Sequence, residues 1–390
     1  MKRIKFNLLN FLIIICLGMI FSCAKISGEK KAEKIISKAA GFLETKGSYL
    51  KIKSISFDNL GLKYLPDKVK FMKNIEKISL KNNNISYLPD FIKDLSKLKE
   101  IDLSGNKLEV FPDKILLIKN LHKLILNNNN LGSIPNEINN LNFLEEFHLA
   151  NNKLKSINES FGDLNNLKFF DISYNYLTSL PGIGFNELLY LNIEGNKLES
   201  IPDEIFTNQI VIIKAGKNNL RLISDKISIC ISLNLLSLEN NQIYIFPQDM
   251  NKLTSLKTLN LSGNRLSYFP SQICEIVSLE NLYLNSNNIS EVPYLIIKMI
   301  NLKKLYLDNN SFYFFPTSLY NIGSSLMELS MKNNNISFLP NELKDKMHLD
   351  FLFLNNNHIK DLSKELEEWK REDASLKIYS KLISNKVIIL

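Results

Sequence analysis

The stretch that decides the fold of this chain reads LKEIDLSGNKLEVFP, at positions 98–112. Apolar residues stand at Leu98, Ile101 and Leu103, and Asn106 and Pro112 follow at fixed distances. The same pattern recurs along most of the sequence, and all 11 prolines of the chain occupy its last position. A fixed period of this kind is the signature of a repeat architecture.

The repeating unit is LxxLxLxxNxLxxLPxxIxxLxx, and fourteen copies can be counted. Its asparagine stands six residues before the proline position in every copy except the first, where Leu60 takes its place. Chance does not produce such a set, so the pattern predicts a structural asparagine ladder. The ladder residues are Asn83, Asn106, Asn129, Asn152, Asn175, Asn196, Asn218, Asn241, Asn264, Asn287, Asn310, Asn334 and Asn357.

Each position of the unit has a physical reason. The LxL segment alternates with period two, which predicts a short strand with its leucines turned inward. One strand cannot bury that face alone, so neighbouring units must stack into a continuous core. A buried asparagine amide both donates and accepts, so it can satisfy the turn that leaves each strand. Proline suits the first position of a helical turn, where its missing N–H costs nothing. The apolar residue three positions later should face the core, as at Ile92, Ile115, Ile138 and Ile273.

The unit resembles the leucine-rich repeat family, and the resemblance covers residues 51–362. The 23-residue form with LPxxI is similar to the Ras-suppressor and Scribble type of repeat. The resemblance implies an α/β repeat fold, a curved solenoid of about 14 repeats with parallel strands on its concave face and a cap at each end. Three units depart from the pattern at the proline position, with Asn158, Ser224 and Ser363.

Residues 1–22 are predicted to be an export signal, because a basic start precedes an apolar stretch, 8–21, that is short for a membrane span. The segment Ile20-Phe21-Ser22-Cys23 resembles the lipobox of bacterial lipoproteins. The resemblance implies that Cys23 is diacylated and becomes the mature N-terminus, and two chains suffice for stable attachment. Ala24 then favours the outer membrane, since an aspartate there marks inner-membrane retention in familiar Gram-negative systems. An ordinary secretory signal is the alternative.

The two ends of the solenoid are expected to be capped, because a terminal unit exposes the core. Residues 23–50 are predicted to form a lipid-anchored tether and then a helix with an apolar face of Ile35, Ile36, Ala39, Phe42 and Leu43. Residues 363–390 are predicted to form the other cap, with Leu362, Leu366 and Trp369 at helical spacing and a final strand at Val387–Leu390.

The sequence offers little chemistry. Its formal net charge of +8 is spread through the repeats without a long basic run, so no nucleic-acid partner is expected. No P-loop, GxSxG, HExxH or CxxC pattern occurs, so we expect no enzyme and no cofactor. His148, Glu146 and Asp171 could hold a metal ion or a proton, although an exposed cross-strand polar pair is the simpler interpretation. Cys230 and Cys274 lie two repeats apart, beyond disulfide reach, and are expected to be core thiols.

The residues beside the second leucine of each LxxLxLxxN segment are expected to point into the hollow of the solenoid. They alternate in charge in the first units and are apolar in several consecutive later ones. Contiguous apolar surface tends to mark an interaction site, and aromatic residues are favoured there. The expected partner-binding residues are Phe169, Tyr174, Tyr190, Ile212, Leu235, Tyr283, Tyr306 and Phe353. In the apolar run Phe169, Tyr190, Ile212 and Leu235, each side chain is expected to be largely exposed.

The sequence therefore predicts a membrane-anchored bacterial leucine-rich repeat lipoprotein that binds a protein partner through its concave face. A surface-exposed adhesin or host-interaction protein is the first hypothesis, and a periplasmic scaffold that organises envelope proteins is the alternative. For the apolar stripe, self-association and a ladder that only stabilises the sheet stay open beside ligand binding.

Overall fold

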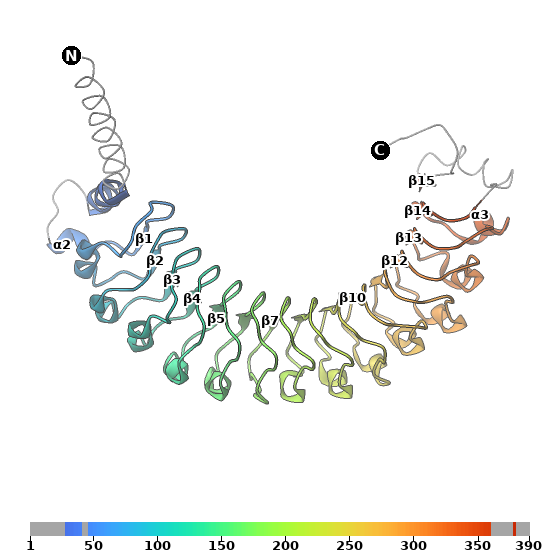
Figure 1. Cartoon of the computed structure of the whole chain (residues 1–390), viewed down its shortest axis with the longest axis horizontal. Helices are drawn as coiled ribbons and strands as arrows, with labels where there is room; N and C mark the ends of the chain where they lie inside the picture. Colours follow the sequence, from blue (N-terminus) through green and yellow to red (C-terminus); the bar gives the residue numbers. More distant parts are fainter. Residues whose placement is uncertain (1–27, 41–45, 360–376, 380–390) are drawn as a thin grey trace, which may run out of the picture. The chain divides into compact units, whose positions relative to one another are not determined.

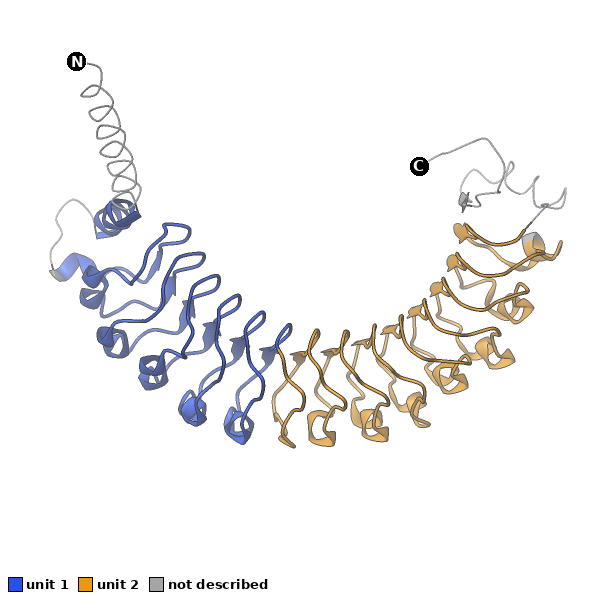
Figure 2. Cartoon of the chain, in the orientation of Figure 1, with its two compact units in different colours: residues 1–175 blue, residues 176–390 orange. Residues whose placement is uncertain are grey.

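A computed structural model describes residues 28–40, 46–359 and 377–379 of the chain (Figure 1). The chain divides into two compact units, residues 1–175 and residues 176–390 (Figure 2). In each unit, strands line one side of the repeats and short helices line the other. The predicted export signal, Cys23, Phe42, Leu43, Leu362, Ser363, Leu366, Trp369 and Val387–Leu390 lie outside the described residues.

Each repeat contributes one short strand, and successive strands pair in parallel and in sequence order within each unit. Unit 1 contains β1 (Ser54–Ser56), β2 (Lys77–Ser79), β3 (Glu100–Asp102), β4 (Lys123–Ile125), β5 (Glu146–His148) and β6 (Phe169–Asp171). Unit 2 contains β7 (Tyr190–Asn192), β8 (Ile212–Lys214), β9 (Leu235–Ser237), β10 (Thr258–Asn260), β11 (Asn281–Tyr283), β12 (Lys304–Tyr306), β13 (Glu328–Ser330), β14 (Phe351–Phe353) and β15 (Lys377–Tyr379). Strands β1–β14 match the fourteen expected copies and confirm the solenoid.

The parallel register aligns equivalent residues, so the inward positions of neighbouring repeats form one continuous core in each unit. Ile78, Ile101 and Leu124 are partners in successive strands and are almost wholly buried. The apolar residue of the return segment is also buried, at Ile92, Ile115, Ile138 and Ile273. Strand and return therefore pack against each other inside every repeat, as the period predicts.

The ladder asparagines join each repeat to the one before it. Asn264 donates from Nδ2 to the carbonyl oxygens of Leu238, in the preceding repeat, at 3.0 Å and of Leu261, in its own turn, at 2.9 Å. Its Oδ1 accepts from the N–H of Ile243 at 2.9 Å. Both ends of the buried amide are thus satisfied, which burial requires.

The same three hydrogen bonds recur along the ladder, and all of its asparagines are buried. They are found at Asn83, Asn106, Asn129, Asn152, Asn175, Asn218, Asn241, Asn287, Asn310, Asn334 and Asn357. At Asn196, Oδ1 accepts from the N–H of Leu177 at 3.0 Å and Nδ2 donates to the carbonyl of Ile193 at 3.1 Å.

The residue just before each ladder position turns the chain with a left-handed backbone. Asparagine or glycine usually stands there, as at Asn82 (φ 54°) and Gly105 (φ 66°), because these residues tolerate positive φ best. Tyr174, Lys217 and Ser286 adopt the same conformation without that tolerance.

The chain returns through 3-10 helices rather than longer α-helices. They are η1 (Asp67–Phe71), η2 (Asp90–Asp94), η3 (Asp113–Leu117), η4 (Asn136–Asn140) and η5 (Glu159–Asp163) in unit 1. Unit 2 has η6 (Asp203–Ile205), η7 (Asp225–Ile229), η8 (Met250–Lys252), η9 (Ser271–Glu275), η10 (Tyr294–Lys298), η11 (Thr317–Ile322) and the short α3 (Leu343–Lys346).

Proline stands at the N-cap of most of these helices, as at Pro66 and Pro89. The sequence predicted proline to be the first helical residue, which is one position later in the helix. In two repeats where another residue takes the place of the proline, that residue's side chain caps the helix instead. The Oδ1 of Asn158 accepts from the N–H of Ser160 at 3.1 Å. The Oγ of Ser224 accepts from the N–H of Lys226 at 3.2 Å. These two departures from the repeat therefore keep its helix start.

The first repeat is covered by helical residues 28–40, and α2 (Lys46–Tyr49) follows. Ala32 and Ile36 of this helix are buried, and the hydroxyl of Tyr64 donates to the carboxylate of Glu29 at 3.0 Å. A side chain at Gly28 would clash with the carbonyl oxygen of Leu60, so the helix lies directly on the repeat. The buried face differs from the expected one, since Ala39 is exposed.

Candidate protein-binding face

The first three strands of unit 2 each begin with an apolar residue, and these three residues lie side by side across the sheet. Tyr190 on β7, Ile212 on β8 and Leu235 on β9 are direct partners in the parallel register. Each is half-buried rather than largely exposed, because side chains on one sheet face shield their neighbours. The ammonium group of Lys214 lies 5.7 Å from the centre of the Tyr190 ring, a distance at which cation and ring attract.

Unit 1 contributes Phe169 and Tyr174 of the predicted residues. Phe169 lies on β6, half-buried, with its ring centre 4.7 Å from that of His148. Tyr174 does not lie on a strand. It occupies the left-handed position of the turn after β6, with φ 53°, and is exposed. A bulky side chain at this φ is strained, and strain of this kind clusters at functional positions.

Tyr283 on β11 and Tyr306 on β12 stack on each other, with ring centres 4.8 Å apart and planes inclined by 10°. The Tyr306 hydroxyl donates to the carboxylate of Glu328, which also pairs with Lys304 at 2.9 Å. Burial and the bond to Glu328 raise the pKa of Tyr306, so this hydroxyl keeps its proton as the donor. The two tyrosines are therefore held as a fixed aromatic platform on the strand face.

Phe353 on β14 is also held in place. Its ring stacks with that of Phe351, with centres 6.3 Å apart and planes inclined by 6°. The ammonium group of Lys332 lies 4.5 Å from the centre of the Phe353 ring. A cation this close to an aromatic face orients the ring as well as binding to it. The predicted residues of unit 2 thus form an apolar row on β7–β9 and aromatic groups on β11–β14.

The strand face of unit 1 carries charges that neutralise one another. Lys77 pairs with Glu100 at 2.8 Å, and Glu76 pairs with Lys53 at 3.0 Å and with Lys99 at 2.9 Å. The hydrogen bonds from Lys99 and Lys53 lower the pKa of Glu76 to about 2. These lysines already have carboxylate partners, which leaves this part of the face poorly suited to binding phosphate groups.

His148, Glu146 and Asp171 come together only as neighbours in a sheet. His148 Nε2 lies 3.4 Å from the carboxylate of Glu146, which pairs with Lys123 at 2.6 Å, and His148 faces Asp171 in the register. Burial lowers the pKa of His148, despite the raising effect of Glu146. In the part of the chain that the structure describes, no three His, Cys, Asp or Glu side chains are arranged to hold a metal ion. The geometry is that of a cross-strand polar pair.

Cys230 and Cys274 are free, buried thiols. Burial raises the pKa of each to about 12, so both stay protonated at neutral pH. A thiol attacks or binds metal as the thiolate, and these two cysteines therefore behave as apolar core residues.

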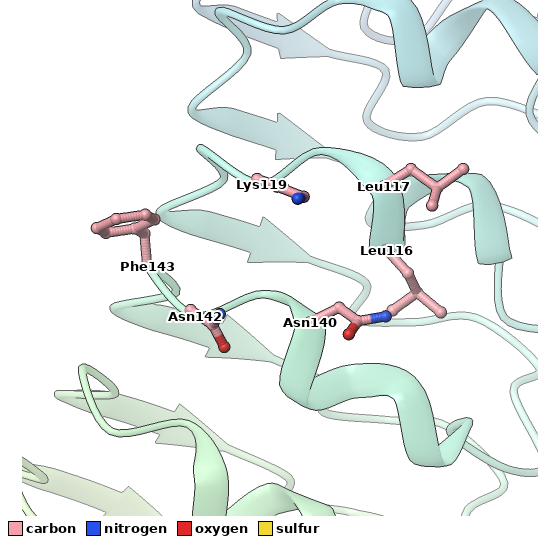
Figure 3. A pocket seen from close by; sticks show the side chains of 6 residues that line it. All are labelled: Leu116, Leu117, Lys119, Asn140, Asn142 and Phe143. Carbon is pink, nitrogen blue, oxygen red and sulfur yellow. The ribbon is translucent and has the colours of Figure 1, made fainter.

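One pocket on the helix side of unit 1, of about 280 Å³, lies between η3 and η4 (Figure 3). The ring of Phe143 at its edge stacks with that of His122, with centres 6.1 Å apart. Only one of the lining side chains is ionisable, so the pocket offers no acid–base pair. It is lined by Leu116, Leu117, Lys119, Asn140, Asn142 and Phe143.

Three strongly exposed aromatic side chains escaped the sequence prediction. Tyr313, Phe314 and Phe338 stand close before a proline and are exposed, whereas the predicted strand residues are half-buried. They lie on the flank of the repeats, between the strands and the 3-10 helices. Aligning the repeats on proline rather than on the strand would have found them.

No helix among the described residues is long and apolar enough to cross a bilayer.

Comparison with known proteins agrees with the repeat geometry. A model of a leucine-rich repeat region matches residues 68–180, and a single leucine-rich repeat matches residues 255–276. No curated protein matches this sequence. The chain is 28% identical to a leucine-rich repeat protein of Leptospira interrogans, with a TM-score of 0.65 over 85% of this chain and 97% of that one.

Two further solved structures share the architecture. A TDR receptor is 27% identical, with a TM-score of 0.69 over 83% of this chain and 59% of that one. An internalin of Listeria monocytogenes is 20% identical, with a TM-score of 0.65 over 88% of this chain and 90% of that one. The fold indicates a role in protein–protein interaction, since such repeats build extended binding surfaces. With its repeat, its asparagine ladder and these similarities, the chain is a leucine-rich repeat protein.

Proposed function

We propose that this chain is a membrane-anchored bacterial protein that binds a protein partner through the strand face of its repeats. The observation that carries the proposal is the apolar row of Tyr190, Ile212 and Leu235 on β7–β9. The strands β7–β9 that carry the row lie on the opposite side of unit 2 from its 3-10 helices (Figure 2). Contiguous apolar residues on such a face tend to mark an interaction site.

A protein fits this face better than other classes of partner. Aromatic residues such as Tyr283 and Tyr306 add contact area at little cost in entropy, because their stacked rings are already fixed. The lysines at the strand starts of unit 1 pair with carboxylates, which argues against nucleic acid on this face: Lys53, Lys77, Lys99 and Lys123. The similarity to a TDR receptor supports a binding role, and leucine-rich repeat proteins typically act as non-enzymatic scaffolds.

The N-terminal sequence supports display from a membrane. The lipobox-like Ile20–Cys23 ends a short apolar stretch, and a diacylated Cys23 would hold the repeats at a bilayer surface. On this basis the partner is a protein of a host or a neighbouring cell, met by a surface-exposed adhesin. Proteolysis of intact cells tests this placement, since a surface protein is cleaved at once. A periplasmic scaffold is cleaved only after the outer membrane is opened.

The binding site itself is tested by comparing two double variants in affinity capture. Tyr190→Ser with Ile212→Ser should abolish capture of the partner bound by the wild-type chain, because hot-spot residues contribute on the order of 2 kcal/mol each. The control, Lys77→Ser with Glu100→Ser, should retain it, because exposed ion pairs contribute little. Both variants should still unfold cooperatively, with the melting curve of the control close to wild type and that of the Tyr190/Ile212 variant moderately lower, because these two side chains are half-buried. Undiminished capture by the Tyr190/Ile212 variant would reject the row as the site.

A further inference from the structure

The part of the chain that directly follows the lipobox-like Ile20–Cys23 carries a concentrated positive charge. Residues 23–73 contain 12 lysines and five acidic residues, which gives a formal charge of +7. Residues 74–390 contain 33 basic and 35 acidic residues, so lysines occur throughout the chain but their excess does not. Beyond the predicted export signal, the molecule is therefore almost neutral except at this cationic end.

Four of these lysines lie on one side of the helix at residues 28–40, which covers the first repeat ahead of α2 (Figure 1). All four are exposed, and at about 100° of rotation per residue they fall within an arc of about 100°. The buried residues of the helix, Gly28, Ala32 and Ile36, point in a direction about 150° away from that arc. The four are here called the lysine face: Lys30, Lys31, Lys34 and Lys38.

The lysine face differs from the lysines of the strand face in its partners. Lys53 and Lys99 both pair with Glu76, whereas none of the four helix lysines forms an ion pair with a residue that the structure describes. The acidic residues of the helix lie on another side of it, and Glu29 accepts from the hydroxyl of Tyr64. Like charges four residues apart repel, so this spacing does not stabilise the helix itself. The lysine face is therefore available to an anionic surface.

The distance along the chain places this helix close to the proposed lipid anchor. Only four residues, 24–27, separate Cys23 from Gly28. The helix therefore begins within about 18 Å of Cys23, since an extended chain spans at most about 3.6 Å per residue. An acyl-bearing Cys23 lies at the headgroup layer, so the helix would lie beside that layer.

We propose that the lysine face rests on the anionic headgroups of the membrane to which the chain is anchored. The inference rests on the lipid attachment proposed above for Cys23. Lysines next to an anionic bilayer are attracted to its surface, and this attraction falls off within a Debye length, about 8 Å at physiological salt. The short tether keeps the helix close enough for that attraction to act.

A bilayer surface fits the lysine face better than an acidic protein or a nucleic acid does. Either macromolecule would have to enter between the helix and a membrane no more than about 18 Å from its first residue. The headgroups are already there. Two acyl chains suffice for stable attachment, so the lysine face contributes position rather than retention. It holds the first repeat against the membrane on one defined side.

Vesicle sedimentation tests the lysine face without the acyl chains. Residues 23–390 with Cys23→Ser retain every residue that the structure describes and cannot be acylated at that position. This chain should bind vesicles of phosphatidylcholine with one-third phosphatidylglycerol about tenfold or more tightly than vesicles of phosphatidylcholine alone. Binding should weaken as the salt concentration rises, because the Debye length shortens.

Two quadruple variants with the same loss of charge decide where binding occurs. Replacing all four residues of the lysine face by glutamine should remove binding to the anionic vesicles, because each lysine contributes roughly fivefold to the partition coefficient. The control replaces four other exposed lysines, none in an ion pair with a described residue, and should retain binding. They are Lys107, Lys153, Lys155 and Lys226. Both variants should melt as the parent chain does, because the replaced side chains are exposed.

Equal binding to the two kinds of vesicle, or an equal loss in both quadruple variants, would overturn the proposal. Detergent-phase partitioning of the chain with its cysteine reports on Cys23 alone. Failure of the lipid anchor and failure of the lysine face therefore give different results.

Discussion

Asn264 shows what one side chain does in almost every repeat. Its amide makes two hydrogen bonds to the preceding repeat, one to the carbonyl of Leu261 and a longer one to the carbonyl of Ser262. Ser262, two residues away, is half-buried, and its side chain takes no part in this network. Replacing Asn264 should therefore lower the free energy of unfolding more than replacing Ser262, although both residues are small and polar.

Asn264→Ala should lower the free energy of unfolding by about 1–3 kcal/mol, because it leaves buried backbone groups of neighbouring turns unpaired. Ser262→Ala should change it little. Thermal or urea unfolding of both variants measures the difference. Equal shifts would contradict the described register.

The helix starts give a prediction at the scale of the element. Ser224 caps η7 through its hydroxyl, and its φ of −62° and ψ of 145° resemble those of the prolines that cap other repeats. Ser224→Ala should destabilise by about 1 kcal/mol, because the N–H of Lys226 loses its acceptor. Ser224→Pro should be close to wild type, because proline fits this φ and restricts the unfolded chain. Urea unfolding of the two variants gives the comparison, and a large loss in the proline variant would contradict it.

The ion pairs at the strand starts predict an acid sensitivity. The pKa of Glu76 is lowered to about 2 from its ordinary value of 4.5, chiefly by hydrogen bonds from Lys99 and Lys53. A lowered folded-state pKa contributes stability that is present above pH 4.5 and is lost as the pH falls towards 2. Glu76→Gln should therefore flatten the loss of stability across that window. The effect should be small, because the group is exposed, and should shrink further in salt.

Melting temperatures measured between pH 5 and pH 2 for wild type and Glu76→Gln follow this loss. Parallel curves would show that the Lys53–Glu76–Lys99 pairing does not affect stability.

For the whole molecule, the period of the sequence settled the strands, the buried leucines and the places of the ladder asparagines. These features could be predicted because side chains along a β-strand alternate between the inward and the outward face. The period could not settle how exposed an outward residue is, since Ile212 is shielded by Tyr190 and Leu235 from other repeats. The period also predicted Pro66 to be the first residue of its helix. In the structure Pro66 is the N-cap, one position before the first helical residue, because proline suits either position at a helix start.

Attachment of the whole molecule depends on a residue outside the described part of the chain. If Cys23 carries the acyl chains, the wild-type protein should enter the detergent phase on phase separation. The Cys23→Ser variant should stay in the aqueous phase, because the thiol that accepts the lipid is gone. A wild-type protein found in the aqueous phase would reject the lipoprotein interpretation.

The asparagine bonds reach from each repeat to the one before it, and they touch only backbone groups there. One repeat can therefore follow any other, whatever side chains its neighbour carries. A gene for such a chain can gain or lose one whole repeat by unequal recombination and still encode a closed ladder. A change of one or two codons need not break it, since the ladder continues through Asn196 and Asn218, which follow shorter repeats. The number of repeats in this protein, and with it the area of its surface, can thus change by one repeat at a time during evolution.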